Sequence, residues 1–181
     1  MSARNWKWIA ATLLVALLVH GASVYFLPRY IMMRTMAGMS RLAGANTIGH
    51  GQRPTSRSRA VVRPSPDLLY STCVYDLDAA GGALRLHTHD MPATYWSVSA
   101  FDMNTNNFYV RNDRQAKDGA VDFLLIARGA FVDGTKLPVV IAPTRRGIVL
   151  FRTLINDETK FADIDRARRN ARCEPYVTQT P

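Results

Sequence analysis

An uncharged run of about 20 residues near the N-terminus constrains this chain more than any other feature. Residues 8–27 read WIAATLLVALLVHGASVYFL and contain no Asp, Glu, Lys or Arg. At a rise of about 1.5 Å per residue, a helix of this length crosses a hydrocarbon core of about 30 Å. Trp8 at one end and Tyr25 and Tyr30 at the other match the preference of aromatic rings for the headgroup level. The run therefore predicts one transmembrane helix.

Two other kinds of segment fit this run less well. A buried core helix of this length is exceptional in a domain this small, and a cleaved signal peptide needs small residues around a cut site. Gly21, Ala22 and Ser23 are the nearest candidates, but apolar residues continue beyond them. We therefore predict an uncleaved signal-anchor over residues 1–28 that inserts into the lipid bilayer. His20, the one ionisable group within residues 8–27, can remain neutral near the end of a single helix.

The excess positive charge of the chain is confined to the anchor and the segment that follows it. The formal net charge is +9, yet no acidic residue precedes Asp67, and acidic and basic residues balance from there onward. The basic residues before Asp67 are Arg4, Lys7, Arg29, Arg34, Arg41, Arg53, Arg57, Arg59 and Arg63. A nucleic-acid-binding domain carries its basic footprint on its own surface, so we expect no nucleic acid as a partner.

The segment between anchor and domain has two parts. Apolar residues recur near helical spacing over residues 29–43, which indicates an amphipathic helix, either on the bilayer or against the domain. They are Ile31, Met32, Met36, Met39 and Leu42. Residues 44–66 are rich in Gly, Ser, Thr, Arg and Pro, which indicates a tether or wrapping loop. We assign 29–59 to an amphipathic and basic tether and 60–175 to the domain, with 60–66 as a candidate edge strand.

The remaining sequence alternates short β-forming runs with turn residues. Runs rich in β-branched and aromatic residues occupy 68–77, 83–87, 94–101, 107–111, 121–127, 137–141 and 147–154. Seven strands at this spacing predict a mainly β domain, an antiparallel β-sandwich or a barrel. A closing helix over 157–172, with Asn156 as candidate N-cap, should pack on the sheet through an apolar stripe. That stripe is Phe161, Ile164, Ala167 and Ala171.

Two cysteines bear on the side of the membrane that the domain occupies. Cys73 lies at the start of the β region and Cys173 follows the closing helix. A bond between them would close a loop of about 100 residues and require an oxidising compartment, whereas two unrelated buried thiols fit equally well. The positive-inside rule does not decide the orientation, because Arg4 and Lys7 are matched by arginines after the span. We predict a single-pass protein of the bacterial inner membrane with a periplasmic C-terminal domain.

Polar residues crowd two strand–turn junctions. They either line a binding pocket or serve turn chemistry and buried hydrogen bonds, and both interpretations remain open. The candidate ligand-binding residues are Asp67, Tyr70, Asp102, Asn104, Asn107 and Arg114. The sequence contains no GxSxG elbow and no glycine-rich phosphate loop, so catalysis by a known template is unsupported.

Three histidines raise the question of a metal site. His87 and His89 are two residues apart and would face the same side of a strand, with His50 as a remote third ligand. No HExxH-like or cysteine-rich pattern accompanies them, so surface or turn histidines are the better interpretation. We predict no metal site and no cofactor.

Three blocks of this sequence resemble the bacterial DUF1254 family, a domain of unknown function. They come in that family's order and are RPSPDLLYSTCVYDL (63–77), MPATYWSVSAFDMNTNNFYVRNDRQ (91–115) and APTRRGIVLFRTLIND (142–157). The resemblance covers about residues 60–172 and implies a β-rich fold. Longer members continue into a second β domain, DUF1214, so this chain looks like a short, membrane-anchored form without it. By resemblance, a separately encoded DUF1214 protein is the partner to expect.

Two functions are compatible with these features. The anchor, the neutral domain and the lack of catalytic templates favour a membrane-tethered envelope domain that binds a partner protein or a small ligand. The alternative is an envelope enzyme, for example a hydrolase, with a polar pocket at the strand–turn junctions. The resemblance supplies no catalytic residues that could decide between them.

Overall fold

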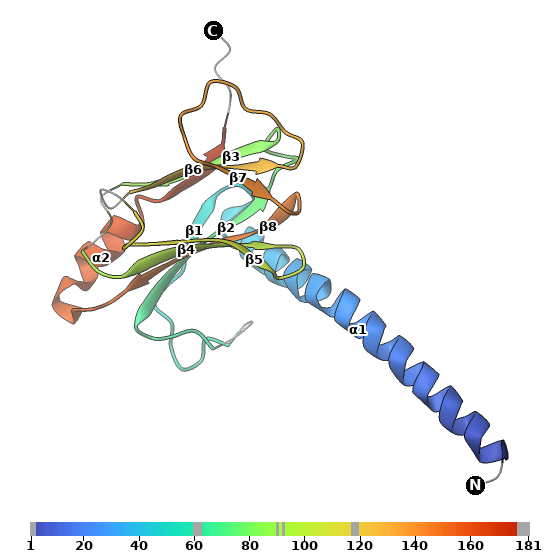
Figure 1. Cartoon of the computed structure of the whole chain (residues 1–181). Coiled ribbons are helices and arrows are strands. Elements are labelled where there is room, and N and C mark those ends of the chain that lie inside the picture. Colours follow the sequence, from blue (N-terminus) through green and yellow to red (C-terminus); the bar gives the residue numbers. More distant parts are fainter. Residues whose placement is uncertain (1–2, 60–62, 90, 92, 117–119, 177–181) are drawn as a thin grey trace.

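The chain folds into one long helix and a β-sandwich (Figure 1). The computed structural model describes residues 3–176 except 60–62, 90, 92 and 117–119. The long helix, α1 (Ala3–Ala43), leaves one side of the sandwich as a single rod, and the N-terminus lies at its far end. Its apolar stretch is long enough to cross a membrane, and none of that stretch is covered by the sandwich.

Helix α1 merges two segments that the sequence separates. It continues through Pro28 without a break and therefore includes both the predicted span and residues 29–43. Beyond Pro28 it packs on the sandwich, where Met32 is buried beside Val74 and Ile148, with Met36 and Met39 against the same cluster. Of the two locations that the amphipathic pattern allowed, the structure therefore has the one against the domain.

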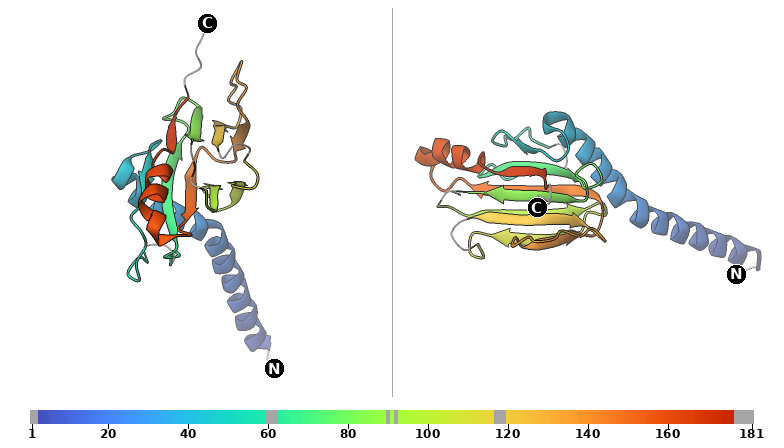
Figure 2. Two further views of the ribbon diagram at one scale, coloured as in Figure 1. Left: turned by 90° about the vertical axis from the view of Figure 1, so that its left-hand side faces the viewer. Right: turned by 90° about the horizontal axis from the view of Figure 1, so that it is seen from above.

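Within the described residues, nine strands form two sheets that pack face to face (Figure 2). The five-stranded sheet has the order β1 (Ile48–His50), β2 (Leu68–Asp76), β8 (Arg146–Leu154), β4 (Trp96–Asp102) and β5 (Asn107–Asn112), with every pair antiparallel. The four-stranded sheet has the order β7 (Val139–Ala142), β6 (Val121–Ala127), β3 (Ala83–Thr88) and β9 (Arg172–Pro175), with β6 and β7 parallel. The mainly β prediction is confirmed, and the architecture is a sandwich. All seven predicted strands are present.

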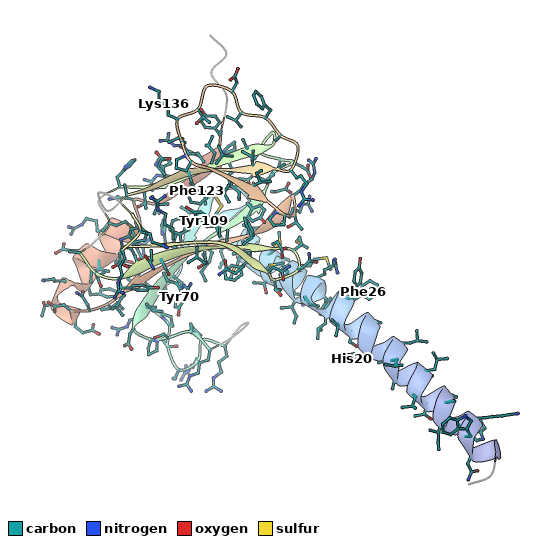
Figure 3. The ribbon with its side chains drawn as sticks, viewed as in Figure 1. His20, Phe26, Tyr70, Tyr109, Phe123 and Lys136 are labelled. Carbon is teal, nitrogen blue, oxygen red and sulfur yellow. A yellow bond between two sulfur atoms is a disulfide. The ribbon has the colours of Figure 1, made fainter. Side chains whose placement is uncertain are left out.

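The core lies between the sheets because strand residues alternate between two faces. Tyr109 of β5 and Phe123 of β6 meet there with ring centroids 4.7 Å apart (Figure 3). Cys73 of β2 and Cys173 of β9 form a disulfide that joins one sheet to the other across this core. On β8, Gly147 has no room for a side chain, because a Cβ there would collide with the Tyr75 ring and the Phe101 carbonyl.

The sheet begins earlier than residue 60. Strand β1 lies in the stretch that the sequence pattern assigns to the tether, and it pairs with β2. The Asn46 side chain bonds the Asp76 backbone twice, as donor to the carbonyl and acceptor from the N–H. These two hydrogen bonds take the place of a backbone–backbone pair between strands, so this short segment stays attached to the sheet. Of the candidate edge strand 60–66, residues 60–62 lie outside the described residues and 63–65 have no regular structure.

The closing helix is shorter than predicted. A 3₁₀ turn, η2 (Glu158–Lys160), leads into α2 (Phe161–Arg168), and the predicted continuation to residue 172 is wrong because Arg172–Pro175 form β9. The N-cap is Asp157 rather than Asn156, since its carboxylate accepts from the Thr159 N–H at 2.9 Å. Pairing with β3 satisfies the backbone of 172–175 and brings Cys173 to Cys73, which a longer helix could not do.

Candidate functional site

The six predicted site residues lie at opposite ends of the five-stranded sheet. Strands β2 and β4 run in the same direction, because both are antiparallel to β8. Asp67, Tyr70 and Arg114 belong to the end where β2 begins and β5 finishes. Asp102, Asn104 and Asn107 belong to the other end, in and beside the β4–β5 turn. The structure therefore does not bring these residues together into one pocket.

In the first group, Tyr70 and Asp67 form hydrogen bonds with the loop that precedes β2. The Tyr70 hydroxyl accepts a hydrogen bond from the Ser65 N–H at 3.0 Å, and the Asp67 N–H donates to the Ser65 hydroxyl at 3.3 Å. The side chains of Asp67 and Arg114 are exposed. Loop hydrogen bonds thus account for the contacts of the Tyr70 hydroxyl and the Asp67 N–H.

The second group builds a tight turn. Asp102 is only 3% exposed, and its carboxylate accepts from the N–H of Asn104 at 2.8 Å and of Asn106 at 2.9 Å. Thr105 between them has φ of +66°, a conformation that these bonds hold. The Asn106 amide also donates to Asp102, whereas the Asn104 side-chain oxygen is buried with no hydrogen-bond partner among the described residues. The turn thus presents one unsatisfied acceptor.

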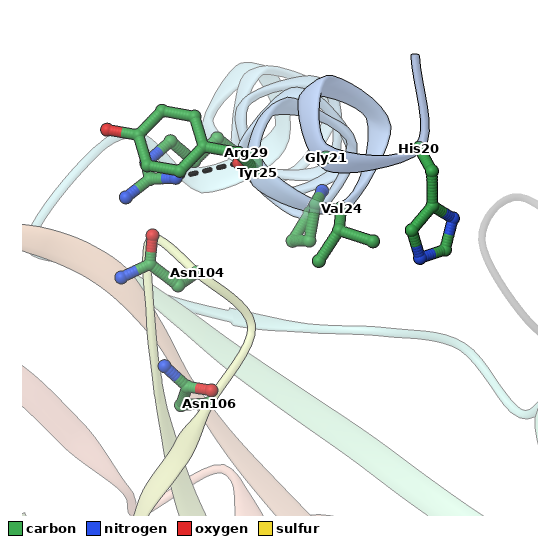
Figure 4. A pocket seen from close by; sticks show the side chains of 8 residues that line it. His20, Gly21, Val24, Tyr25, Arg29, Asn104 and Asn106 are labelled. Carbon is green, nitrogen blue, oxygen red and sulfur yellow. Dashed lines mark hydrogen bonds between the residues drawn. The ribbon is translucent and has the colours of Figure 1, made fainter. Parts of the chain in front are cut away.

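A cavity of about 610 Å³ separates this turn from α1 (Figure 4). We call it the α1–turn cavity, and its lining residues are His20, Gly21, Val24, Tyr25, Pro28, Arg29, Asn104 and Asn106. Arg29 Nη1 donates to the Tyr25 carbonyl at 2.7 Å, and its guanidinium carbon lies 4.0 Å from the centroid of the Tyr25 ring. Asn104 faces this pair from the other side. The lining contains a fixed cation and no carboxylate.

A row of polar side chains crosses the outer face of the five-stranded sheet, and the sequence analysis missed most of it. Neighbouring strands pair Tyr70 with Arg152, Arg152 with Ser97, and Ser97 with Asn112. Arg152 Nη2 donates to Ser99 at 2.8 Å, while Arg152 Nε, Ser97 Oγ and Asn112 Oδ1 are buried without a partner among the described residues. The available signal was the alternation of Ser97 and Ser99 with apolar residues, which puts polar groups on the face away from the core.

The serine–histidine contact between Ser71 and His50 is structural. Ser71 Oγ lies 2.9 Å from His50 Nδ1, as a nucleophile would from its base, but Ser71 is 2% exposed and also accepts from Arg168 at 3.1 Å. Burial, followed by the charge of Arg168, lowers the pKa of His50 to about 4. Arg168 further donates to the Gly51 carbonyl at 2.7 Å and ion-pairs with Asp165. This cluster joins α2 to β1 and β2.

The histidines do not assemble a metal centre in the part of the chain that the structure describes. His87 and His89 have ring centroids 5.4 Å apart at the end of β3, while His50 belongs to β1 in the other sheet. His87 Nε2 lies 3.1 Å from the Glu174 carboxylate on β9. Among the described residues, no group of three His, Cys, Asp or Glu side chains is placed to hold an ion.

Comparisons with known proteins give a family and a fold. The fold is similar to that of the VPA0106 protein from Vibrio parahaemolyticus, with a TM-score of 0.62 and 12% identity over 88% of this chain and 42% of that one. An uncharacterised protein from Burkholderia cenocepacia has a TM-score of 0.50 and 16% identity over 86% and 42%. This chain thus spans less than half the length of both structures. No curated protein is significantly similar to it.

The family assignment comes from the sequence itself. Residues 45–175 match the model of a family described as a protein of unknown function, DUF1254. The match starts at the segment that Asn46 holds on β2 and ends with β9, so it includes the whole sandwich. The chain therefore belongs to the DUF1254 family.

Proposed function

We propose that this protein is a binding domain of the bacterial cell envelope, anchored in the inner membrane by α1 and exposed to the periplasm, that acts together with a DUF1214-type partner chain. The observation that carries the proposal is the continuity of α1. The helix runs from its apolar stretch into the Met32 cluster without a break, so the sandwich is held next to the end of the span. A domain held in this way is suited to recruit a partner at the membrane.

The disulfide supports the periplasmic side. Cys73 and Cys173 are bonded to one another, and protein disulfides persist in oxidising compartments such as the periplasm. The arginines on both sides of the span leave the orientation open, so the disulfide is the stronger argument.

An exposed apolar edge supports a partner chain. Strand β7 is a four-residue edge strand of its sheet, and Val139 and Ile141 on it are 45% and 59% exposed. Phe131 in the preceding loop is 85% exposed. An edge strand with exposed apolar side chains is suited to pair with another chain. The two similar structures are more than twice as long as the part they share with this chain, which leaves room in them for a second domain.

The enzyme alternative has less support. The polar residues that it needs in one pocket lie at two ends of a sheet. The Ser71–His50 pair is covered and bonded to Arg168. We therefore favour binding over catalysis.

Co-purification tests the partner. The tagged full-length chain is extracted from its native membranes in mild detergent, and the bound proteins are identified by mass spectrometry. We expect a DUF1214-type protein with the unchanged chain and a loss of at least about tenfold when Val139→Asp and Ile141→Asp are combined. The matched control is Val110→Asp, an exposed apolar residue on the edge strand of the other sheet. Enrichment of no DUF1214-type protein over a control bait contradicts the partner.

A fusion tests the side of the membrane. A reporter enzyme that is active only outside the cytoplasm, joined after Pro181, should be active in cells. A stable but inactive fusion reverses the proposed orientation.

A further inference from the structure

We propose that the α1–turn cavity binds the phosphate-bearing headgroup of a membrane phospholipid. This inference rests on the transmembrane placement of α1 and adds a ligand class that the partner proposal does not contain. The hydrogen-bonding groups that line the cavity and the position of the cavity along α1 support this proposal.

Arg29 supplies the donors. Its Nη1 is used by the Tyr25 carbonyl, while Nε and Nη2 make no hydrogen bond to the described residues. The ring of Tyr25 holds the guanidinium in place through a cation–π contact. A guanidinium with two free donors matches two oxygens of a phosphate. The lining contains no carboxylate that would compete with a phosphate for Arg29. The nearby Asp102 carboxylate already accepts hydrogen bonds from Asn104 and Asn106.

Two acceptors belong to residues of the same cavity lining. The Asn104 side-chain oxygen is buried and without a partner among the described residues. Pro28 has no N–H, so the Val24 carbonyl one turn earlier loses the donor that a regular helix provides. A ligand that carries a phosphate together with an ammonium or hydroxyl group satisfies both kinds of site. The headgroups of phosphatidylethanolamine and phosphatidylglycerol have this combination.

The position along α1 fits a lipid. From His20 to Arg29 the helix rises about 14 Å, from inside the predicted span to just beyond its end. Tyr25 and Phe26 pack edge to face at the same level, where aromatic side chains mark the membrane interface. Gly21, at the end of the cavity that lies within the predicted span, has open space around it. An acyl chain can therefore leave the cavity along the helix. Arg29 thus lies nearer the membrane interface, while Gly21 and Val24, beside His20, lie nearer the middle of the predicted span.

Lipid retention tests the proposal. The full-length chain in mild detergent is mixed separately with phosphatidylglycerol, phosphatidylethanolamine and diacylglycerol, and bound lipid is counted by native mass spectrometry. We expect one phospholipid per chain and about tenfold less diacylglycerol, which lacks the phosphate. Arg29→Gln should lower phospholipid retention about tenfold. Arg34→Gln, which removes the same charge from an exposed position on the same helix, should change it less than about twofold.

A second pair of variants tests the same cavity independently, in case Arg29→Gln does not fold. Asn104→Ala should lower retention about threefold, while Asn107→Ala, an exposed neighbour outside the cavity lining, should leave it unchanged. Equal retention of diacylglycerol and phospholipid overturns the proposal. So does an equal loss in Arg29→Gln and Arg34→Gln, because that result indicates diffuse charge attraction.

Inorganic phosphate is the other source of the same chemistry. In large excess it should not displace the phospholipid, because it lacks the acyl chains and the second donor. Displacement assigns the cavity to a soluble phosphate and overturns the lipid proposal. Since this assay contains no partner chain, failure to find a DUF1214-type protein leaves its outcome unaffected.

Discussion

Two helices pack against the five-stranded sheet, and only one of them adds buried hydrogen bonds to its apolar contact. Helix α1 contacts it through methionines, with Met32 against Val74 and Ile148. Helix α2 contacts it through Ile164, which packs with Leu69 of β2, and also through Arg168, whose hydrogen bonds reach the Tyr70 carbonyl, Ser71 and the Gly51 carbonyl. Methionine contacts are non-directional and adapt to small shifts, whereas a guanidinium with several partners fits one arrangement.

The two helices therefore have different roles in the structure. The α2 end holds β1 and β2 in position, and the Cys73–Cys173 disulfide separately joins β2 to β9 of the other sheet. The α1 end joins the long apolar helix to the sandwich through apolar contacts, and among the described residues no side-chain hydrogen bond or ion pair connects residues 29–43 to the strands. We therefore expect this contact to tolerate some change in the tilt of α1. Four predictions test this contrast.

The largest expected effect is at Arg168. Arg168→Met leaves Asp165 and the carbonyls of Gly51 and Tyr70 without this partner, so we expect a loss of about 3–5 kcal/mol in the free energy of unfolding. Urea titration in detergent measures it. Arg166→Met, at an exposed ion pair with Asp163, serves as control and should cost less than about 0.5 kcal/mol. Similar small losses in both variants would show that α2 does not lock the sheet.

The disulfide should have the next largest effect. Replacing Cys73 and Cys173 together by Ser should lower the free energy of unfolding by about 2–4 kcal/mol, because the unfolded chain regains the freedom of a long loop. A reducing agent should cause the same loss in the unchanged protein and none in the double variant. If the reducing agent has no effect on the unchanged protein, the bond is absent in solution.

A smaller and local effect is expected at α1. Met32→Ala should weaken the docking of residues 30–43 and raise their amide exchange about tenfold, while exchange in β8 changes by less than about threefold. The control is Met33→Ala, because Met33 is 52% exposed. Loss of protection throughout the sandwich would contradict an adaptable contact and make α1 part of the folding core.

The smallest effect at neutral pH is expected at His50, whose contribution changes only in acid. His50 has a pKa of about 4 in the folded protein and about 6.5 in the unfolded chain, so between these values the unfolded chain binds more protons. Stability should therefore fall as the pH decreases from about 6.5 to about 4, with the full contribution present above about 6.5. His50→Asn should flatten this part of the pH profile in thermal unfolding. An unchanged slope would assign the acid sensitivity to other groups.

Local patterns in the sequence were enough to predict most elements. The absence of charge over residues 8–27 predicted a span, and period-two alternation with turn residues predicted seven strands that the structure contains. Both signals depend on neighbours along the chain. Segments held by distant partners escaped prediction: β1 depends on Asn46 reaching Asp76, and β9 on pairing with β3.

The candidate site depended almost entirely on tertiary structure. The sequence by itself determined the long apolar helix, the alternating faces of the strands and the asparagine-rich β4–β5 turn, because helix length, strand period and turn chemistry are local properties. It could not determine that Asp67 and Asp102 lie at opposite ends of one sheet, because strand order and direction are set by pairing between distant segments. Only the packing of α1 through Met32 brings Arg29 opposite Asn104, 75 residues later in the chain, and creates the cavity between them.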